Sequence, residues 1–94
     1  MNASFFSGTA SDLAAGDLPN GGGRYFNFDL TEFSARGDAT VVRINAYGAV
    51  ASSGEKIVRD GTLCHVGGHL RQTRGGRLTL VARQIAFETA EADQ

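Results

Sequence analysis

The chain has 94 residues, of which 41% are hydrophobic, so it is long enough for one small core and one domain. Its formal net charge of −1 excludes a uniformly basic surface, and its single Cys excludes an internal disulfide. No apolar run approaches the roughly 18 residues of a membrane span, and no basic region followed by an apolar one opens the chain. We therefore expect a cytoplasmic protein that has no membrane partner.

The charges are unevenly distributed along the chain. Glu88, Glu91 and Asp93 lie in the last seven residues, and residues 1–87 carry nine basic against seven acidic side chains, net +2. Eight of the nine basic residues are Arg, which favours planar contacts that bridge phosphates. We predict a folded domain over residues 1–87 and an acidic, disordered tail over residues 88–94.

The composition favours a small all-β fold with tight turns, since the chain has 13 Gly and 6 Phe. A first strand is predicted over residues 4–10, with Phe5 or Phe6 facing inward and Gly8 at a bend. Residues 11–16 continue it more loosely. Residues 18–23 predict a turn, because Pro fixes φ and Asn-Gly adopts positive φ.

The clearest strand covers residues 24–33, where aromatic and polar side chains alternate. The inward set is Phe26, Phe28 and Leu30, and the outward set is Tyr25, Asn27 and Asp29. A third strand is predicted over residues 40–46, again with every second residue small or apolar. A helix of about three turns follows, because the apolar period changes there from two to that of a helix. Its predicted buried face is Val50, Gly54, Ile57 and Val58, and Asp60-Gly61 is expected to end it.

Period two returns over residues 62–72, which predict a fourth strand containing Cys64, Val66 and Leu70. The Gly67-Gly68 pair inside it indicates a bulge or sharp bend. Residues 73–76 form a hairpin turn before a fifth strand over residues 77–87. In that strand, the inward side changes near Arg83, so a second irregularity is predicted there. Its apolar residues are Leu78, Leu80, Ala82, Ile85 and Phe87.

Five strands with one helix between the third and the fourth match a Greek-key OB-fold barrel. In this order the chain resembles bacterial single-stranded DNA-binding proteins and their relative, the primosomal replication protein PriB. The motifs that carry the resemblance are Gly8, Pro19-Asn20-Gly21-Gly22, Phe28-Asp29-Leu30, Tyr47-Gly48, Asp60-Gly61 and CHVGGHLR at residues 64–71. They span almost the whole chain.

The resemblance implies non-sequence-specific binding of single-stranded DNA, or of RNA, by a homodimer or homotetramer that pairs through its first strand. Several features depart from the family pattern. The chain has no Trp, Val41 stands where a stacking aromatic is usual, and Tyr47 is the clear aromatic match. The chain also lacks the terminal Pro-Phe tip that recruits partners. These departures favour a PriB-like or plasmid-type accessory role with possible replication partners. The alternative is a protein-interaction module that has lost nucleic-acid binding.

The first candidate site is the hairpin between the fourth and fifth strands, which carries Arg71, Arg74 and Arg77 around two glycines. Three guanidinium groups within seven residues form a local positive site. Proteins that bind single-stranded nucleic acid use such positively charged surfaces to contact the backbone. The alternative interpretation is an exposed turn that charge keeps soluble.

The second candidate site is the outer face of the sheet. Tyr25 and Tyr47 are predicted to stack on bases, Arg43 to meet a phosphate, and His69 to lie beside them. The alternative is that part of this face lies between subunits.

We expect neither a metal site, nor a cofactor, nor catalytic residues. His65 and His69 have no third ligand at a recognisable spacing, and Cys64 is expected to be a small buried hydrophobe. No nucleophile, base and acid are spaced as an enzyme would need.

Overall fold

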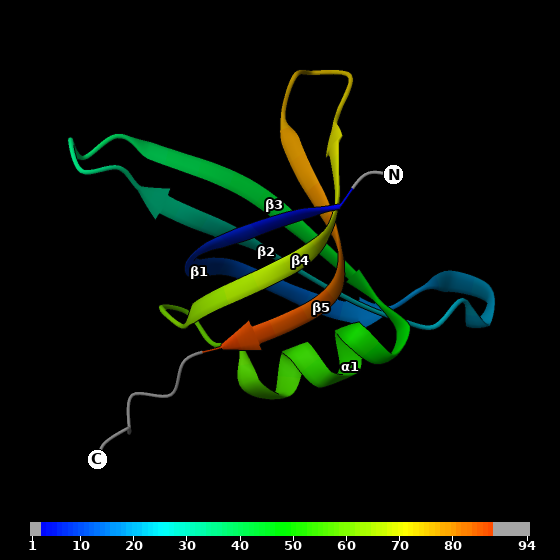
Figure 1. Ribbon diagram of the computed structural model, residues 1–94. Coiled ribbons are helices and arrows are strands. Elements are labelled where there is room, and N and C mark those ends of the chain that lie inside the picture. Colours follow the sequence, from blue (N-terminus) through cyan, green and yellow to red (C-terminus); the bar gives the residue numbers. More distant parts are fainter. Residues whose placement is uncertain (1–2, 88–94) are drawn as a thin grey trace, which may run out of the picture.

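The computed structural model describes residues 3–87, which form a closed barrel of five strands with one α-helix (Figure 1). The elements are β1 (Ser4–Asp17), the 3₁₀ turn η1 (Pro19–Gly21), β2 (Arg24–Phe33), β3 (Ala39–Tyr47), α1 (Gly48–Ile57), β4 (Leu63–Gln72) and β5 (Leu78–Phe87). The strand order around the barrel is β1-β2-β3-β5-β4, with β3 and β5 parallel and the other pairs antiparallel. The predicted OB-fold is confirmed.

The predicted tail over residues 88–94 lies outside the described residues. Within residues 3–87, no helix combines the length and the apolar character needed to cross a membrane.

The barrel core is built from the alternating inward residues that the sequence indicates. Phe26, Phe28 and Leu30 of β2 are buried, and the rings of Phe26 and Phe28 are 5.2 Å apart between centroids. The inward residues of β3 are buried as well: Val42, Ile44 and Ala46. Cys64 and Val66 of β4 and Leu80 and Ala82 of β5 complete the opposite wall.

Helix α1 closes one end of the barrel, at the bottom of Figure 1. It packs through Ala51 and Gly54, because a Cβ at Gly54 would lie 3.1 Å from Ile85 and 3.2 Å from Phe26. Two details of the prediction are wrong. The helix ends at Ile57, three residues before Asp60, and Ile57 is 36% exposed. The contact is made by small residues that allow close approach, so larger side chains lie at its border.

Strand β1 includes both the predicted first strand and its looser continuation, and it pairs with two neighbours. Its first part, up to Thr9, pairs with β4, and from Thr9 onward it pairs with β2. The register shifts between Ser11 and Ala14, where Asp12 has a φ of 56°. Gly8 lies at a close crossing of two strands, because a Cβ there would lie 2.4 Å from the carbonyl oxygen of Thr31.

The two predicted irregularities of β4 and β5 form one bulge. Gly67 pairs with Gln84 and Gly68 with Ala82, so Arg83 is the extra residue and lies on β5. A Cβ at Gly68 would lie 2.0 Å from the carbonyl oxygen of Val81, which only Gly avoids. Beyond the bulge the two strands continue as a hairpin past the barrel wall (Figure 1). For this reason the predicted core positions Leu70 and Leu78 are exposed.

Candidate nucleic-acid interface

The strand register places predicted site residues from three strands in shared cross-strand rows. Arg43 on β3 lies opposite Thr79 on β5, and Thr79 lies opposite Arg71 on β4. Residues directly opposite each other project from the same face of a sheet. With strands about 4.8 Å apart, the backbones of Arg43 and Arg71 are roughly 10 Å apart on the outer surface.

A second row passes through Asn45, Val81 and His69, so His69 lies beside Arg71 on the same face of β4. Tyr25 lies opposite Tyr47 at the adjoining end of the β2–β3 pair. The structure therefore brings five of the seven predicted residues onto one continuous outer surface, and Arg74 and Arg77 follow in the hairpin turn.

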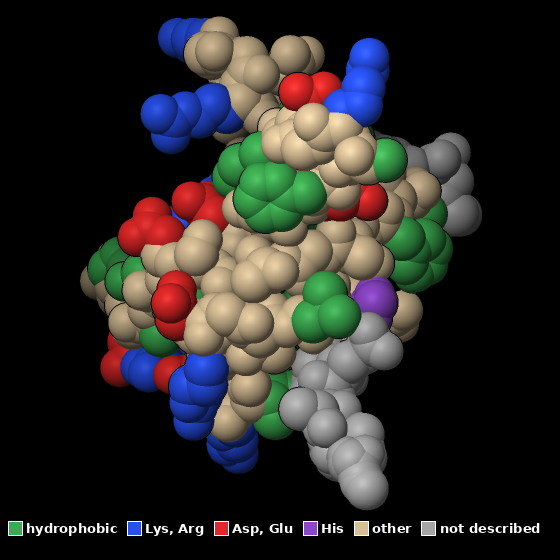
Figure 2. Space-filling model, turned by 90° about the vertical axis from the view of Figure 1, so that its left-hand side faces the viewer, with side chains coloured by type: hydrophobic (Ala, Val, Ile, Leu, Met, Phe, Trp, Pro, Cys, Tyr) green, Lys and Arg blue, Asp and Glu red, His purple; other side chains and the backbone are tan. Residues whose placement is uncertain are grey.

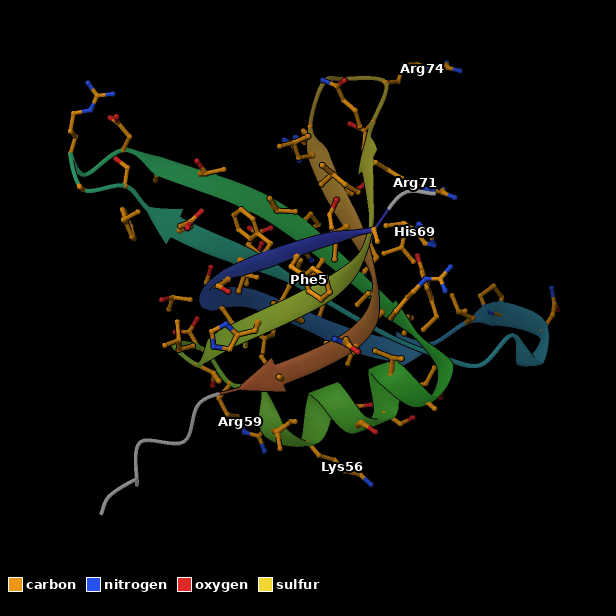
Figure 3. The ribbon with its side chains drawn as sticks, viewed as in Figure 1. Phe5, Lys56, Arg59, His69, Arg71 and Arg74 are labelled. Carbon is orange, nitrogen blue, oxygen red and sulfur yellow. The ribbon has the colours of Figure 1, made fainter. Side chains whose placement is uncertain are left out.

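The hairpin arginines are exposed and have no ion-pair partner among residues 3–87. Thr73 N donates to the carbonyl oxygen of Arg77 at 2.8 Å, and Gly76 N to that of Thr73 at 2.9 Å, which closes the turn. Across residues 3–87, no carboxylate lies within ion-pair distance of Arg71, Arg74 or Arg77. Figure 3 shows His69, Arg71 and Arg74 pointing to the same side of the hairpin.

Arg43 lies on this surface, but carboxylates already neutralise it. Its Nη1 lies 3.2 Å from Asp29 Oδ1 and 3.6 Å from Asp12 Oδ2, and it donates to the carbonyl oxygen of Asp12 at 3.0 Å. A phosphate would have to compete with these two acidic side chains. The geometry therefore gives Arg43 a structural contact that the sequence did not predict.

Arg24, which the sequence analysis did not single out, ties three elements together. It binds Glu55 of α1 through two bonds, at 2.6 Å and 2.8 Å, and Asp17 of β1 at 3.2 Å. The hydrogen bonds to Glu55 raise the pKa of Arg24, and the same contact lowers the pKa of Glu55 below its ordinary value. This group stabilises the fold, and its two carboxylates leave Arg24 no positive charge for a ligand.

The two predicted tyrosines differ in what they offer a ligand. Tyr47 is 48% exposed at the end of β3. Tyr25 is half-buried, and its ring lies over Gly16, where a Cβ would be 2.8 Å from the Tyr25 hydroxyl. Tyr47 therefore presents an open ring, whereas Tyr25 is seated on β1.

Two exposed aromatic rings were missed by sequence reasoning. Phe33 is 65% exposed at the end of β2, and Phe5 is 76% exposed on β1. The alternation that places Tyr25 outward continues by twos to Phe33, so the pattern itself contained that information. Phe5 and Phe6 were left as alternatives, and Phe6 is the one that packs against the core.

The histidines have side-chain partners on neighbouring strands. His65 Nδ1 lies 2.7 Å from Ser7 Oγ, and His69 Nε2 is hydrogen-bonded to the guanidinium of Arg83. Because a guanidinium only donates, His69 Nε2 is the accepting nitrogen. In the described part of the chain, no group of three or more His, Cys, Asp or Glu residues could hold a metal ion. Burial raises the pKa of the Cys64 thiol, as for a small hydrophobe in a core.

Charge is divided between the two halves of the domain. Residues 1–60 contain all seven acidic side chains of residues 1–87 and five basic ones, net −2. Residues 61–87 contain four Arg and no acidic residue, net +4. In Figure 2, Lys and Arg side chains gather at the top and bottom of the surface, and Asp and Glu lie mainly between them. The net charge of −1 conceals this division.

Three solved structures with the same architecture are single-stranded DNA-binding proteins. The yeast mitochondrial protein Rim1 from S. cerevisiae has 19% identity and a TM-score of 0.75, covering 92% of each chain. The chain has the fold of these single-stranded DNA-binding proteins. The second single-stranded DNA-binding protein of Mycobacterium smegmatis has 17% identity and a TM-score of 0.82, covering 99% of this chain and 94% of its own.

A third structure of this fold is the single-stranded DNA-binding protein domain of a Synechococcus protein. It has 15% identity and a TM-score of 0.79, covering 90% of this chain and 93% of its own. No family model and no curated protein matches the sequence.

Proposed function

We propose that this OB-fold protein binds single-stranded DNA without sequence specificity and performs no chemistry on it. The observation that carries the proposal is the acid-free β4–β5 hairpin, whose three arginines make no ion pair with any described residue. OB-folds bind oligonucleotides on the face of strands 2 and 3 and with the loops between strands 1 and 2 and strands 4 and 5. The proteins that share this fold are named for the same activity.

The strand would cross the outer surface from β2 and β3 to β4. Arg71, Arg74 and Arg77 supply charge that no carboxylate of residues 3–87 pairs with, and counterion release then drives binding. Tyr47 and Phe33 supply open rings on which bases stack. Stacking and charge together explain tolerance of any sequence, because every base has a π-face and every nucleotide a phosphate.

We propose that the protein is a homodimer or homotetramer that pairs through β1. Up to Gly8, β1 pairs only with β4 among the described strands, and its pairing with β2 begins at Thr9. The other edge of that segment is therefore open to a second strand, and edge pairing with a copy covers such an edge. A cytoplasmic, PriB-like accessory role in replication, recombination or plasmid maintenance accompanies this proposal.

A titration of labelled oligo-dT at low salt, followed by anisotropy, tests the function directly. Affinity should fall with salt with a slope near −0.7 per phosphate neutralised. Competition with oligo-U measures any preference between DNA and RNA. Absence of binding at tens of micromolar protein would contradict the proposal.

The open edge of β1 and the exposed ring of Phe5 favour one other function, an adaptor subunit without nucleic-acid binding. In that case the oligonucleotide titration stays flat while a pull-down returns a stoichiometric protein partner. Light scattering with and without oligonucleotide separates the two functions in a single measurement.

A further inference from the structure

A recess of about 620 Å³ lies on the outer wall, between the start of β1 and the β4–β5 bulge. Its lining includes Phe5, Gly67, Gly68, His69, Arg83 and Gln84. Pockets for small ligands have volumes of about 300–1,000 Å³ and combine apolar walls with a few converging polar groups. This recess has both properties.

Phe5 forms an aromatic platform that the backbone holds in place. A Cβ at Gly67 would lie 2.7 Å from the Phe5 ring, so the ring rests directly against the Gly67 backbone. Phe5 is nevertheless 76% exposed, which leaves its other face open. The ring is thus ordered by packing on one side and available for stacking on the other.

The polar wall is cationic and contains no acid. The bulge on β5 places Arg83 at the recess, where its guanidinium is hydrogen-bonded to His69. Gln84 adds an amide, and none of the described lining residues is Asp or Glu. An acidic peptide would match this charge as well, but the free aromatic face favours a ligand that is both planar and anionic.

The recess is continuous with the hairpin arginines. His69 and Arg71 are two residues apart on β4, so both project outward with roughly 6.8 Å between them along the strand. Figure 3 shows Phe5 near the base of the hairpin, with His69, Arg71 and Arg74 following in order toward its tip. A strand bound along the hairpin would reach the recess at its lower end.

We infer that the recess receives one unpaired nucleobase of the bound strand, stacked on Phe5, with an adjoining phosphate on Arg83. This inference rests on the proposed function and adds a base site on the β1–β4–β5 wall, away from the β2–β3 face. The other occupant of an open apolar recess would be a second copy of the chain, which the experiment below distinguishes.

Tryptophan substitution provides the test, because the chain has no Trp and an introduced one is the sole reporter. Phe5→Trp should lose most of its fluorescence when oligo-dT saturates the protein. The matched control is Leu63→Trp, an exposed position on the same outer face of β4, roughly 14 Å along the strand from Gly67. Its fluorescence should stay nearly constant.

Two further variants measure the energetic role of the recess. Phe5→Leu should weaken oligonucleotide binding about 5- to 150-fold, the range for loss of one base–aromatic stack. Arg83→Gln should reduce the salt slope by about 0.7. Lys56→Gln removes the same charge from α1, at the other end of the molecule, and should leave the slope unchanged (Figure 3).

The outcomes separate this inference from the function on which it rests. If anisotropy shows binding while Phe5→Trp fluorescence is unchanged, the base site is overturned and the proposed function stands. If Phe5→Trp fluorescence responds to protein concentration without oligonucleotide and then no longer responds to oligo-dT, a second copy occupies the recess and the inference is again overturned. If the unaltered protein binds no oligonucleotide, both proposals fail.

Discussion

Arg43 and Arg71 lie in the same cross-strand row, yet their surroundings are opposite. Arg43, on the β3 side, is neutralised by Asp12 and Asp29, whereas Arg71, on the hairpin side, pairs with no carboxylate in the described part of the chain. The contrast extends to both regions as a whole, since residues 61–87 contain no acidic side chain. An arginine count therefore says little about a binding surface until each guanidinium is matched with its neighbours.

The largest effect is expected from removing the three hairpin arginines. The triple variant Arg71→Ala, Arg74→Ala and Arg77→Ala should abolish oligo-dT binding at moderate salt and flatten the salt slope by about 2, three phosphates at roughly 0.7 each. Because these side chains make no ion pairs in residues 3–87, Tm and oligomer mass should hardly change. Salt-dependent anisotropy measures the slope.

The control is the double variant Lys56→Gln and Arg59→Gln, which removes two exposed charges from the helical end of the molecule (Figure 3). A comparable loss of binding in this control would show that total charge, not the hairpin, governs affinity.

The next effect concerns the two tyrosines, which lie opposite each other but differ in exposure. Tyr47→Leu should cost about 1–3 kcal/mol of binding free energy, the range for one base stack. Tyr25→Leu should cost less binding but more thermal stability, because the ring of Tyr25 lies over Gly16. Anisotropy and thermal melts on both variants check this. Equal binding losses would contradict the assignment of Tyr47 as the open platform.

A smaller effect is expected at Arg43. Arg43→Gln should change the salt slope by less than the roughly 0.7 expected for one phosphate, since Asp29 and Asp12 already neutralise this cation. Asp29→Asn should have the opposite effect and tighten binding by releasing Arg43. If Arg43→Gln reduces the slope as much as Arg71→Ala does, the contrast between the two regions is wrong.

The smallest effect on binding is expected at Arg24, whose role is structural. Arg24→Gln should lower Tm and leave oligonucleotide affinity unchanged, because it breaks the contacts with Glu55 and Asp17. Arg24 lowers the folded-state pKa of Glu55, so this stabilisation is present above the unfolded pKa of about 4.3 and is lost as pH falls through the folded value. The Tm difference between the unaltered protein and Glu55→Gln should therefore shrink below about pH 4. A constant difference from pH 7 to pH 3 would rule this out.

Much of the fold could be predicted from local pattern. The bounds of β2, the burial of Phe28 and the bulge at Gly67-Gly68 all follow from period-two alternation and from the special backbone of Gly. The end of α1 was misplaced, because Val58 continues the apolar period and is buried, although its backbone is already extended.

The candidate site was less predictable, because partners far apart in sequence decide which charges are free. Arg43 meets Asp12 across 31 residues, and Arg24 meets Glu55 across the same separation. No local pattern encodes those pairs. Two features could, in contrast, be read from the sequence. Residues 61–87 contain no acidic residue, and the alternation of β2 places Phe33 on the outer face.

The close backbone contact at Gly68 fixes the residue type at that position, whereas the sequence and length of the nearby turn at residues 73–76 can vary. A methyl group at Gly68 would collide with the Val81 carbonyl, whereas the backbone hydrogen bonds of the turn at residues 73–76 stay within the hairpin. A mutational library selected for folding alone should thus reject every replacement at residue 68 and accept insertions a few residues later. Under the proposed function, the length of single-stranded DNA that each molecule covers could then vary over evolution while the barrel stayed fixed.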